Sequence, residues 1–536
     1  MRMPRRSFGP FPLLLSALLL LSARSGAEDF LNQRLNQDAT TELQNEQQIA
    51  VNPADPNNMV AVWRDFRLGY RQVGWACTFD GGYTWTEGGL FQEPNYPWQS
   101  DPALTASVGG VFYAVLLSYT STSEPNGLFL YRSTDGGATW GAPLEVIDQV
   151  PAVFEDKEFV ACDRTGGAHD GNLYVAWSRF GYSSDIVFRR TANGGMTWGP
   201  VLAVDDDNGS QFPIPVVGRG GEVFVAWSNY YDEVIKIDVS NDGGVSFGTD
   251  RTVTGVYSVY NVLNGDINAY ASPHMDADIT DGPHAGRLYL AFMDRRGGSG
   301  DFDIWVMTSD DGALHWSAPA RVNDDPFNNG RDQFLPWLTV DNLGVVTIVF
   351  LDRRHDPANR TYHCYLAQSL DGGATWSPNV RVSTEPSDPV HALREAAGPA
   401  AETAGKSGDV SSAAAPSVSR AGLLGEYIGV ASWDGYPVPV WTDIRNLHQD
   451  TYAGYPLVKT RVAERKAASF RPELAVAPHP VRIGGEATVR APFGGGVLHM
   501  YDVRGRLVRS FPFGSRTISL SVLGGRGWGG RGGPSA

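Results

Sequence analysis

Four Asp-x-Arg pairs stand at the ends of similar apolar runs and could hold an acidic or polyhydroxyl ligand. The pairs are Asp65 with Arg67, Asp294 with Arg296, Asp352 with Arg354, and Asp443 with Arg445. A guanidinium can form two parallel hydrogen bonds with a carboxylate, and it can also bind sugar hydroxyls. Because the pattern recurs, the alternative is that each pair braces its own loop. These eight residues are therefore our ligand-binding candidates, and loop bracing is the competing interpretation.

The chain contains repeated sequence motifs, described below, and a catalytic residue is expected at a position that does not recur in them. The candidates are Glu158, Asp276, Glu426 and Tyr427. Glu426 and Tyr427 come nearest to an activated tyrosine, but neighbouring residues on a strand point to opposite faces. The sequence contains no His cluster, phosphate-binding loop or nucleophile elbow. It therefore assigns no catalytic residue, and whether the protein is an enzyme stays open.

A metal site is considered only at the acid-rich loop Asp205–Gly209. Carboxylate oxygens are suitable Ca²⁺ ligands, although such loops are more often solvated turns. We therefore predict no cofactor and no metal ligand, with Ca²⁺ as the one ion worth testing. Cys77, Cys162 and Cys364 lie in apolar runs and are predicted to be small buried side chains, with one disulfide as an alternative.

Six near-copies of a turn recur about every 58 residues and organise the chain. Each copy has the pattern Ser/Thr-x-Asp/Asn-x-Gly-x-Thr/Ser-Trp, with small departures, and the acidic or amide positions are Asp80, Asp135, Asn193, Asp242, Asp311 and Asp371. The carboxylate can accept backbone N–H bonds in its own loop, while glycine adopts a positive φ. These residues are predicted to be structural because the turn uses the carboxylate.

A second repeated element is a short run of the type Val-Ala-Trp, which occurs seven times. The copies are 59–63, 111–116, 173–177, 223–227, 288–292, 346–350 and 437–441, and a further apolar run precedes each. Together with the turns, they predict units of four antiparallel strands, which is the blade of a β-propeller. The all-β prediction is a seven-bladed propeller, with six blades as the alternative.

Ring closure explains why there are seven such runs but only six turns. Residues 33–37 (QRLNQ) match the fourth strands of two blades and are expected to supply the outer strand of blade seven. This arrangement would cover an exposed sheet edge. Residues 385–421 are rich in Ala, Ser and Gly, and are expected to be a flexible insertion in blade seven.

The turns resemble the Asp-box, or BNR, repeat of sialidase-like propellers, and the resemblance covers residues 29 to 457. It implies a propeller that acts on or binds extracellular glycans. A sialidase has an arginine cluster, a Tyr–Glu pair and an Asp acid. The family's Phe/Tyr-Arg-Ile-Pro motif is absent, since the corresponding run Gln47–Val51 has no Arg. Sialidases also have six blades. The predicted function is therefore binding of an extracellular glycan or protein, with a sialidase-type exo-glycosidase as the alternative.

The chain's last part differs in charge from the propeller. The whole chain has a formal net charge of −16; residues 1–27 contribute +4 and residues 458–536 contribute +9, which leaves about −29 for 28–457. We expect a linker at 458–469 and a small β module at 470–536. Val497–Arg509 resembles a FlgD-like or type IX secretion sorting domain of bacterial surface proteins, possibly truncated. The alternative is an accessory sandwich.

The predicted location and partners follow from the same features. Residues 1–27 have a basic end, an apolar run and small residues before Glu28, as in a secretory signal peptide. The protein is therefore expected to be secreted or at the cell surface, with no membrane span after signal removal. A strongly acidic propeller would repel nucleic acid. We expect a monomer with a glycan or protein partner.

Overall fold

The computed structural model describes residues 30–120, 126–389 and 424–457, and the backbone of six strands between 475 and 531. The chain divides into two compact units, residues 1–459 and 460–536. The predicted signal peptide, the linker and residues 390–421 of the predicted insertion lie outside the described residues. At the start of that insertion, Ser387 forms a β-bridge with Tyr362.

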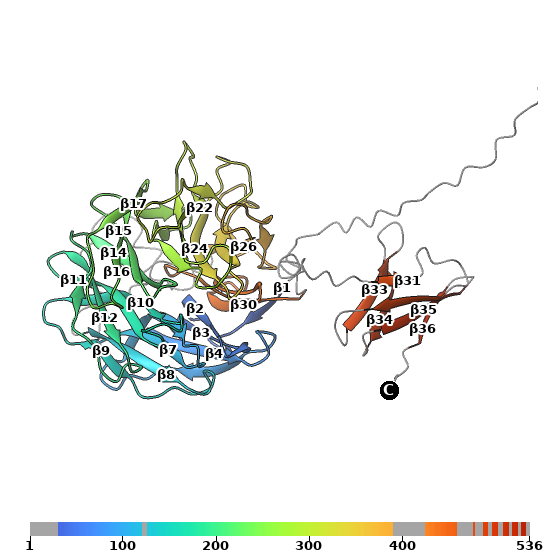
Figure 1. Cartoon of the computed structure of the whole chain (residues 1–536), viewed down its shortest axis with the longest axis horizontal. Helices are drawn as coiled ribbons and strands as arrows, with labels where there is room; N and C mark the ends of the chain where they lie inside the picture. Colours follow the sequence, from blue (N-terminus) through green and yellow to red (C-terminus); the bar gives the residue numbers. More distant parts are fainter. Residues whose placement is uncertain are drawn as a thin grey trace, which may run out of the picture. The chain divides into compact units, whose positions relative to one another are not determined.

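Seven antiparallel four-stranded sheets are arranged in a ring (Figure 1). Blade one has β2 (Gln44–Asn52), β3 (Asp55–Asp65), β4 (Gln72–Thr78) and β5 (Thr86–Leu90). Blade two has β6 (Trp98–Ala106), β7 (Phe112–Tyr119), β8 (Asn126–Ser133) and β9 (Leu144–Asp148). Blade three has β10 (Phe154–Cys162), β11 (Leu173–Phe180), β12 (Ser184–Thr191) and β13 (Leu202–Ala203).

The remaining blades follow the same order. Blade four has β14 (Ser210–Val217), β15 (Val223–Asn229), β16 (Val234–Ser240) and β17 (Arg251–Gly255). Blade five has β20 (His274–Ala277), β21 (Leu288–Asp294), β22 (Asp303–Ser309) and β23 (Ala320–Arg321). Blade six has β24 (Gln333–Val340), β25 (Val346–Asp352), β26 (His363–Ser369) and β27 (Val380–Arg381). Blade seven has β28 (Gly429–Trp433), β29 (Tyr436–Asp443), β30 (Asp450–Pro456) and, from the N-terminal part of the chain, β1 (Phe30–Arg34).

Ring closure by the N-terminal part of the chain is confirmed, although the closing strand spans residues 30–34 and overlaps the predicted 33–37 only at its end. β1 pairs antiparallel with β30, and Phe30 lies opposite Pro456. Leu35 is fully buried and its amide donates to the Thr451 carbonyl at 2.8 Å. The seven-bladed prediction is therefore correct, and the six-bladed alternative is wrong.

The Val-Ala-Trp runs form the second strand of every blade. Their tryptophans, which include Trp63, Trp177, Trp227 and Trp441, are fully buried. Both faces of these strands are covered because blades stack against each other around the ring, so the core is divided into several inter-blade clusters. Blade one thus shares a cluster with blade seven, in which Ile49 and Trp63 pack with Val440. This burial explains why the runs are apolar at nearly every position.

The repeated turns connect the third and fourth strands of blades one to six. In the last copy, the Asp371 carboxylate accepts bonds from the Thr375 amide at 2.9 Å, the Thr375 hydroxyl at 2.6 Å and the Ser369 hydroxyl at 2.9 Å. Gly373 has φ of 84° and its amide donates to Ser369. Blade three makes the same contacts to Thr197 with the amide of Asn193.

These contacts predict the effect of substitutions at Asp371. Asp371→Ala should lower the free energy of unfolding by about 1 kcal/mol, because the hydroxyl and amide donors lose an acceptor at a solvated site. Asp371→Asn should change it by less than about 0.5 kcal/mol, since Asn193 already serves in the equivalent turn. Urea unfolding of the two variants checks this, and equal losses in both would contradict the role given to the turn.

One hairpin was not predicted from the sequence. β18 (Tyr260–Leu263) and β19 (Ile267–Tyr270) pair between blades four and five. Its buried Leu263 and Ile267 belong to a core cluster shared by blades five, six and seven. The short alternation of polar and apolar residues in this segment lies outside the 58-residue repeat, so the repeat could not identify it.

The second unit contains six strands whose backbone is described. They are β31 (Ala475–Ala477), β32 (Glu486–Arg490), β33 (Gly496–Tyr501), β34 (Leu507–Phe513), β35 (Thr517–Leu523) and β36 (Gly527–Arg531). They form a four-stranded sheet, β31-β32-β35-β36, and a separate β33-β34 pair.

Two further sequence expectations concern covalent links and membranes. In the structure all three cysteines are buried and free, so the alternative of a disulfide is wrong. Among the described residues, no helical segment combines the length and hydropathy of a membrane span.

Candidate functional site

The four Asp-x-Arg pairs are each closed within their own blade. The distances between guanidinium and carboxylate are 2.6 Å for Arg67–Asp65, 2.7 Å for Arg296–Asp294, and 2.8 Å for both Arg354–Asp352 and Arg445–Asp443. In blades one and seven the aspartate also accepts the indole N–H of the buried tryptophan on the second strand, Trp63 or Trp441, at 2.8 Å. The carboxylates therefore anchor the ends of the second strands.

The guanidinium groups extend away from the ring axis. Arg445 lies over the ring of Tyr452 on the third strand and donates to Asn32 on the outer strand β1. Arg67 likewise forms an ion pair with Glu87 on the outer strand β5. These contacts use the donors that a ligand would need, so the structure does not bring the pairs together around the axis. It favours the bracing interpretation, and ligand binding by these residues stays a prediction.

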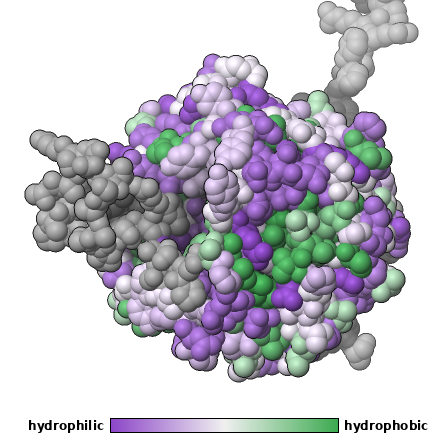
Figure 2. Space-filling model, turned by 90° about the vertical axis from the view of Figure 1, so that its left-hand side faces the viewer, coloured by the Kyte–Doolittle hydropathy of each residue, from purple (hydrophilic) through white to green (hydrophobic). Residues whose placement is uncertain are grey.

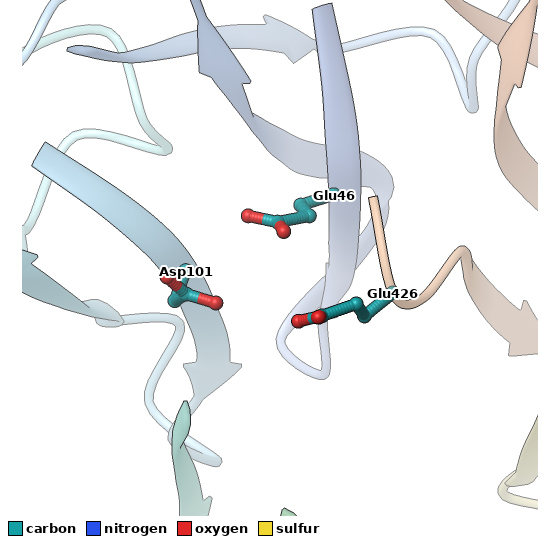
Figure 3. A group of neighbouring side chains, drawn as sticks. All are labelled: Glu46, Asp101 and Glu426. Atoms are coloured by element: carbon teal, nitrogen blue, oxygen red, sulfur yellow. The ribbon is translucent and has the colours of Figure 1, made fainter. Parts of the chain in front are cut away.

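Two of the four symmetry-breaking candidates, Glu158 and Glu426, lie instead at the axis. They belong to what we call the axial ion cluster: Glu46, Asp101, Lys157, Glu158 and Glu426. The Lys157 ammonium contacts the carboxylates of Asp101 and Glu426, and its Nζ is 3.8 Å from Glu46 Oε1. Figure 3 shows Glu46, Asp101 and Glu426 reaching toward one another from three different strands or loops. One oxygen of each lies within 4.8 Å of the others. The cluster therefore joins blades seven, one, two and three.

A repeated irregularity of the innermost strands positions this cluster. The pairing of first and second strands shifts register between Asn45 and Gln48 in blade one, and at the equivalent step in blades two, three, four and six. Glu46, Asp101 and Lys157 occupy the bulged position with φ of 57°, 51° and 53°. Such β-bulges redirect a side chain. Here the redirected side chains converge on the axis.

Burial and charge set the protonation of the cluster. Burial raises the pKa of Glu46 to about 7, although Arg64 at 2.8 Å opposes this shift. Burial also raises the pKa of Glu158 well above its usual value. The charges of Lys157 and Arg64 overcome the effect of burial on Asp101 and lower its pKa. The four acids of the cluster outnumber the two nearby cations, Lys157 and Arg64. The raised pKa values of Glu46 and Glu158 favour the neutral form of these two acids, which reduces the excess of negative charge.

Tyr427 does not act together with Glu426. Its hydroxyl donates to the Pro102 carbonyl at 3.2 Å, while the Glu426 carboxylate turns to Lys157. Burial raises the pKa of Tyr427 well above its usual value. The sequence expectation that these adjacent side chains diverge thus agrees with their contacts, and a sialidase-like Tyr–Glu pair is not formed by these two residues.

A layer of aromatic side chains packs next to the axial ion cluster. The Phe159 ring lies 5.6 Å from that of Trp337 and 5.4 Å from that of Tyr427. His274 lies 4.1 Å from Trp337. Phe159 and Trp337 each stand two positions further along their inner strand than the bulged residues Lys157 and Leu335, and therefore form the next level along the axis.

Beyond the aromatic layer lies a cavity of about 600 Å³, which we call the axial cavity. The inner strands of all seven blades line it. The lining reaches the loops between first and second strands at Pro53 and Val108, and the end of β28 at Trp433. Val108 is exposed, so the cavity reaches the surface there. These loops share a face with the repeated turns, since the Gly81 amide donates to Asn57 at the start of the second strand. The ligand-binding candidates from the sequence, the Asp-x-Arg pairs, lie at the opposite ends of the second strands and therefore on the opposite face.

Asp276, the fourth candidate, lines the axial cavity. Its carboxylate accepts bonds from the Val340 amide at 2.8 Å and from the Thr339 hydroxyl at 3.2 Å, which links blade five to blade six. Burial raises its pKa. Asp341 in the same lining is capped in the same way by the amides of Leu343 and Val345. These acids are held by the protein and face the cavity with few free acceptors.

The proposed Ca²⁺ loop is largely closed by its own protein partners. Asp206 and Asp250 each accept the other's backbone amide, at 3.0 and 3.2 Å. Asp207 pairs with Lys236. In the axial ion cluster, which is the one group of metal-compatible acids among the described residues, the Lys157 ammonium contacts two of the three carboxylates. An ammonium therefore takes the place that a cation would fill.

The surface at the edge of the ring differs from the axis. Figure 2 shows the side that lies at the left in Figure 1, where polar residues cover most of the face and surround an apolar area. Exposed apolar residues are common at protein surfaces and do not by themselves indicate a binding site.

Sequence reasoning missed Glu46, Asp101, Lys157 and the cavity-lining Arg164. A signal for the first three was present, because each stands three residues before an inner-strand apolar residue, Ile49, Leu104 or Val160. Aligning the inner strands would have placed three charged residues at one repeat position. No sequence pattern shows that they meet, since they belong to different blades.

Comparisons with known proteins give distant similarities to solved structures. No family model and no curated protein matches the chain. Among solved structures, it is similar to a leech intramolecular trans-sialidase complexed with 2,7-anhydro-Neu5Ac (12% identity over 60% of this chain and 67% of that one, TM-score 0.43). It is also similar to the Hadza microbial sialidase Hz136 (14%, 74% and 76%, TM-score 0.42) and to a Penicillium chrysogenum α-L-arabinanase complexed with arabinobiose (14%, 60% and 93%, TM-score 0.40).

Proposed function

We propose that this protein is a non-catalytic propeller that binds an extracellular glycan in its axial cavity. The observation that carries the proposal is the cavity itself, whose volume of about 600 Å³ suits a small saccharide. Trp337 and Trp433 contribute to its wall, and aromatic rings offer apolar faces to sugars. The axial ion cluster and the aromatic layer adjoin its inner end, so the ligand would enter from the face of the repeated turns.

Glycoside hydrolysis is the second candidate. It is favoured by acids of opposite pKa shift, since the pKa of Glu46 rises to about 7 while that of Asp101 falls. Their oxygens lie within 4.8 Å, near the separation of about 5 Å in retaining glycosidases. However, Glu46 is fully buried and Lys157 bridges the acids. Because a sugar could not reach this cluster without displacing its own counter-ion, binding is the better-supported function.

We also propose that the protein is exported, on the basis of two features of its sequence. Residues 1–27 would direct secretion, and the part from 470 onward would act as a surface-sorting module. The Asp-box assignment of the turns belongs to the same proposal. It is supported by the hydrogen-bonded geometry that six copies of the turn motif share, as described for Asp371.

Filling the axial cavity should abolish binding. Thr105 lines the cavity and is partly exposed, so Thr105→Trp would occupy the space of a sugar ring. Thr252→Trp, on the exposed outer strand β17, is the matched control and should bind normally. A glycan array of the mature full-length protein identifies ligands, and isothermal titration compares the variants. Equal binding by both variants would place the site elsewhere.

A panel of chromogenic glycosides, led by the sialic acid substrate and measured with and without Ca²⁺, separates the two candidates. We expect no turnover. Hydrolysis that Glu46→Gln removes would instead establish the glycosidase.

A further inference from the structure

Arg164 is the one cationic side chain in the lining of the axial cavity. It is half-buried, and within the described parts of the chain it forms no ion pair and no hydrogen bond through its guanidinium. The arginines of the Asp-x-Arg pairs, by contrast, are all paired with carboxylates. A guanidinium with free donors in a cavity is a group prepared for an external acceptor.

The position of Arg164 breaks the repeat. It lies in the loop after β10, where Asp163 Oδ1 accepts the Thr165 amide at 2.9 Å. Blade five has the same loop, in which Asp278 Oδ1 accepts the Thr280 amide at 2.9 Å, but the residue between them is Ile279. Both middle residues line the cavity. The loop therefore folds equally with an apolar residue, so its structure does not require the arginine.

The acids near Arg164 are already engaged. Asp276 accepts its bonds from Thr339 and Val340 of the next blade, and Asp281 at the rim pairs with Arg219. Asp276 is close enough for the Arg164 charge to lower its pKa partly, against the larger effect of burial. It nevertheless shares no hydrogen bond with Arg164.

His274 offers a second polar group to the cavity. It is 4% exposed, lines the cavity, and its Nδ1 has no hydrogen-bond partner among the described residues. Burial lowers its pKa to about 3, so the imidazole is neutral at physiological pH. A neutral imidazole can donate to or accept from a hydroxyl. Its neighbour Trp337, whose ring is tilted by 45° to the imidazole, supplies the adjoining aromatic surface.

We propose that the axial cavity selects saccharides that carry a carboxylate, with Arg164 binding the carboxylate and His274 and Trp337 contacting the sugar ring. This inference rests on the proposed function and specifies its ligand. A carboxylate-bearing sugar suits this wall because it provides both a planar anion for the guanidinium and hydroxyls for the imidazole. A neutral sugar would leave the Arg164 donors unpaired in the half-buried mouth.

The test is a calorimetric titration of the mature full-length protein with digalacturonate and with its neutral counterpart, digalactose. We expect digalacturonate to bind at least about tenfold more tightly, as one charged hydrogen-bonded pair would provide. Arg164→Ile, which copies blade five, should remove that preference and leave the melting temperature unchanged. Arg219→Gln removes an exposed cation at the same rim and should preserve the preference.

The outcomes are distinguishable. If both sugars bind equally and Arg164→Ile has no effect, the carboxylate selectivity is wrong while glycan binding stands. If neither these sugars nor any other saccharide, sialic acid included, binds, both proposals are wrong. If a peptide with a free C-terminal carboxylate binds instead and depends on Arg164, the residue binds anions but the saccharide ligand is wrong.

Discussion

Replacing Lys157 with methionine is expected to destabilise the propeller by about 3–5 kcal/mol, because the variant leaves buried carboxylates without their shared cation. Lys157 is 3% exposed and contacts Asp101 and Glu426, with Glu46 close by. Since native proteins are stable by only about 5–15 kcal/mol, this is a large fraction of the total. Urea unfolding of the full-length variant at pH 7.5 measures it.

Lys236 provides a matched control. It also has three carboxylate neighbours, Asp207, Asp232 and Asp250, but the first two are more than half exposed. Water already screens these charges, so Lys236→Met should cost at most about 1 kcal/mol. A similar loss for both variants would mean that burial of the axial ion cluster is not what makes Lys157 important.

Lowering the pH should relieve part of the defect in Lys157→Met. With the lysine absent, the buried acids can become neutral by taking up protons, as the already raised pKa of Glu46, about 7, indicates. A folded-state pKa above that of the unfolded chain means that folding binds protons, so stability decreases as pH rises toward 7. The difference between variant and wild type should therefore shrink from pH 7.5 to pH 5.5.

Deleting residues 30–36 is expected to abolish cooperative folding of the ring. The deletion removes β1 and the fully buried Leu35, and it exposes the edge of β30. Burial of Leu35 and Phe30 contributes about 1.5–3 kcal/mol each, before the lost backbone bonds are counted. An open hydrophobic edge also promotes association between chains. Light scattering after gel filtration and a thermal melt should show aggregates and no sharp transition.

A point variant separates the strand from its side-chain contacts. The Asn32 side chain donates to the Val382 carbonyl at 2.9 Å and accepts from the Thr384 amide at 2.8 Å. Asn32→Ala keeps the backbone pairing and should cost only about 1–2 kcal/mol with a cooperative melt. If the deletion also melts sharply as a monomer, ring closure by β1 is not required for folding.

The effects of Lys157→Met and of the deletion of residues 30–36 have a common origin. The ring of blades is held together at its axis and at the point in blade seven where the two ends of the ring meet. The ion cluster ties four blades at the axis, and β1 ties the two ends of the ring in blade seven. The cavity between the inner strands remains open toward one face because the cluster and the aromatic layer fill the other end. The groups that stabilise the ring and the opening for a ligand therefore lie at different levels along the same axis.

The sequence by itself determined the fold because the signals that specify a blade are local. The repeated turn and the Val-Ala-Trp run lie within about 20 residues of each other, and each specifies its own hairpin or buried strand. The count of seven runs and the match of residues 33–37 to outer strands were sufficient to predict the closed ring. The β18–β19 hairpin falls outside the repeat and was missed for that reason.

Only the tertiary structure decided which residues meet at the axis and on which face a ligand could enter. Glu46, Asp101, Lys157 and Glu426 come from four blades, and bulges turn three of them inward, which no spacing in the sequence reveals. The Asp-x-Arg pairs looked like a ligand site, but packing on outer aromatic rings directs arginines such as Arg445 away from the axis. Local sequence motifs specify the fold of each blade, whereas packing between distant parts of the chain decides which residues form the axial ion cluster and the axial cavity.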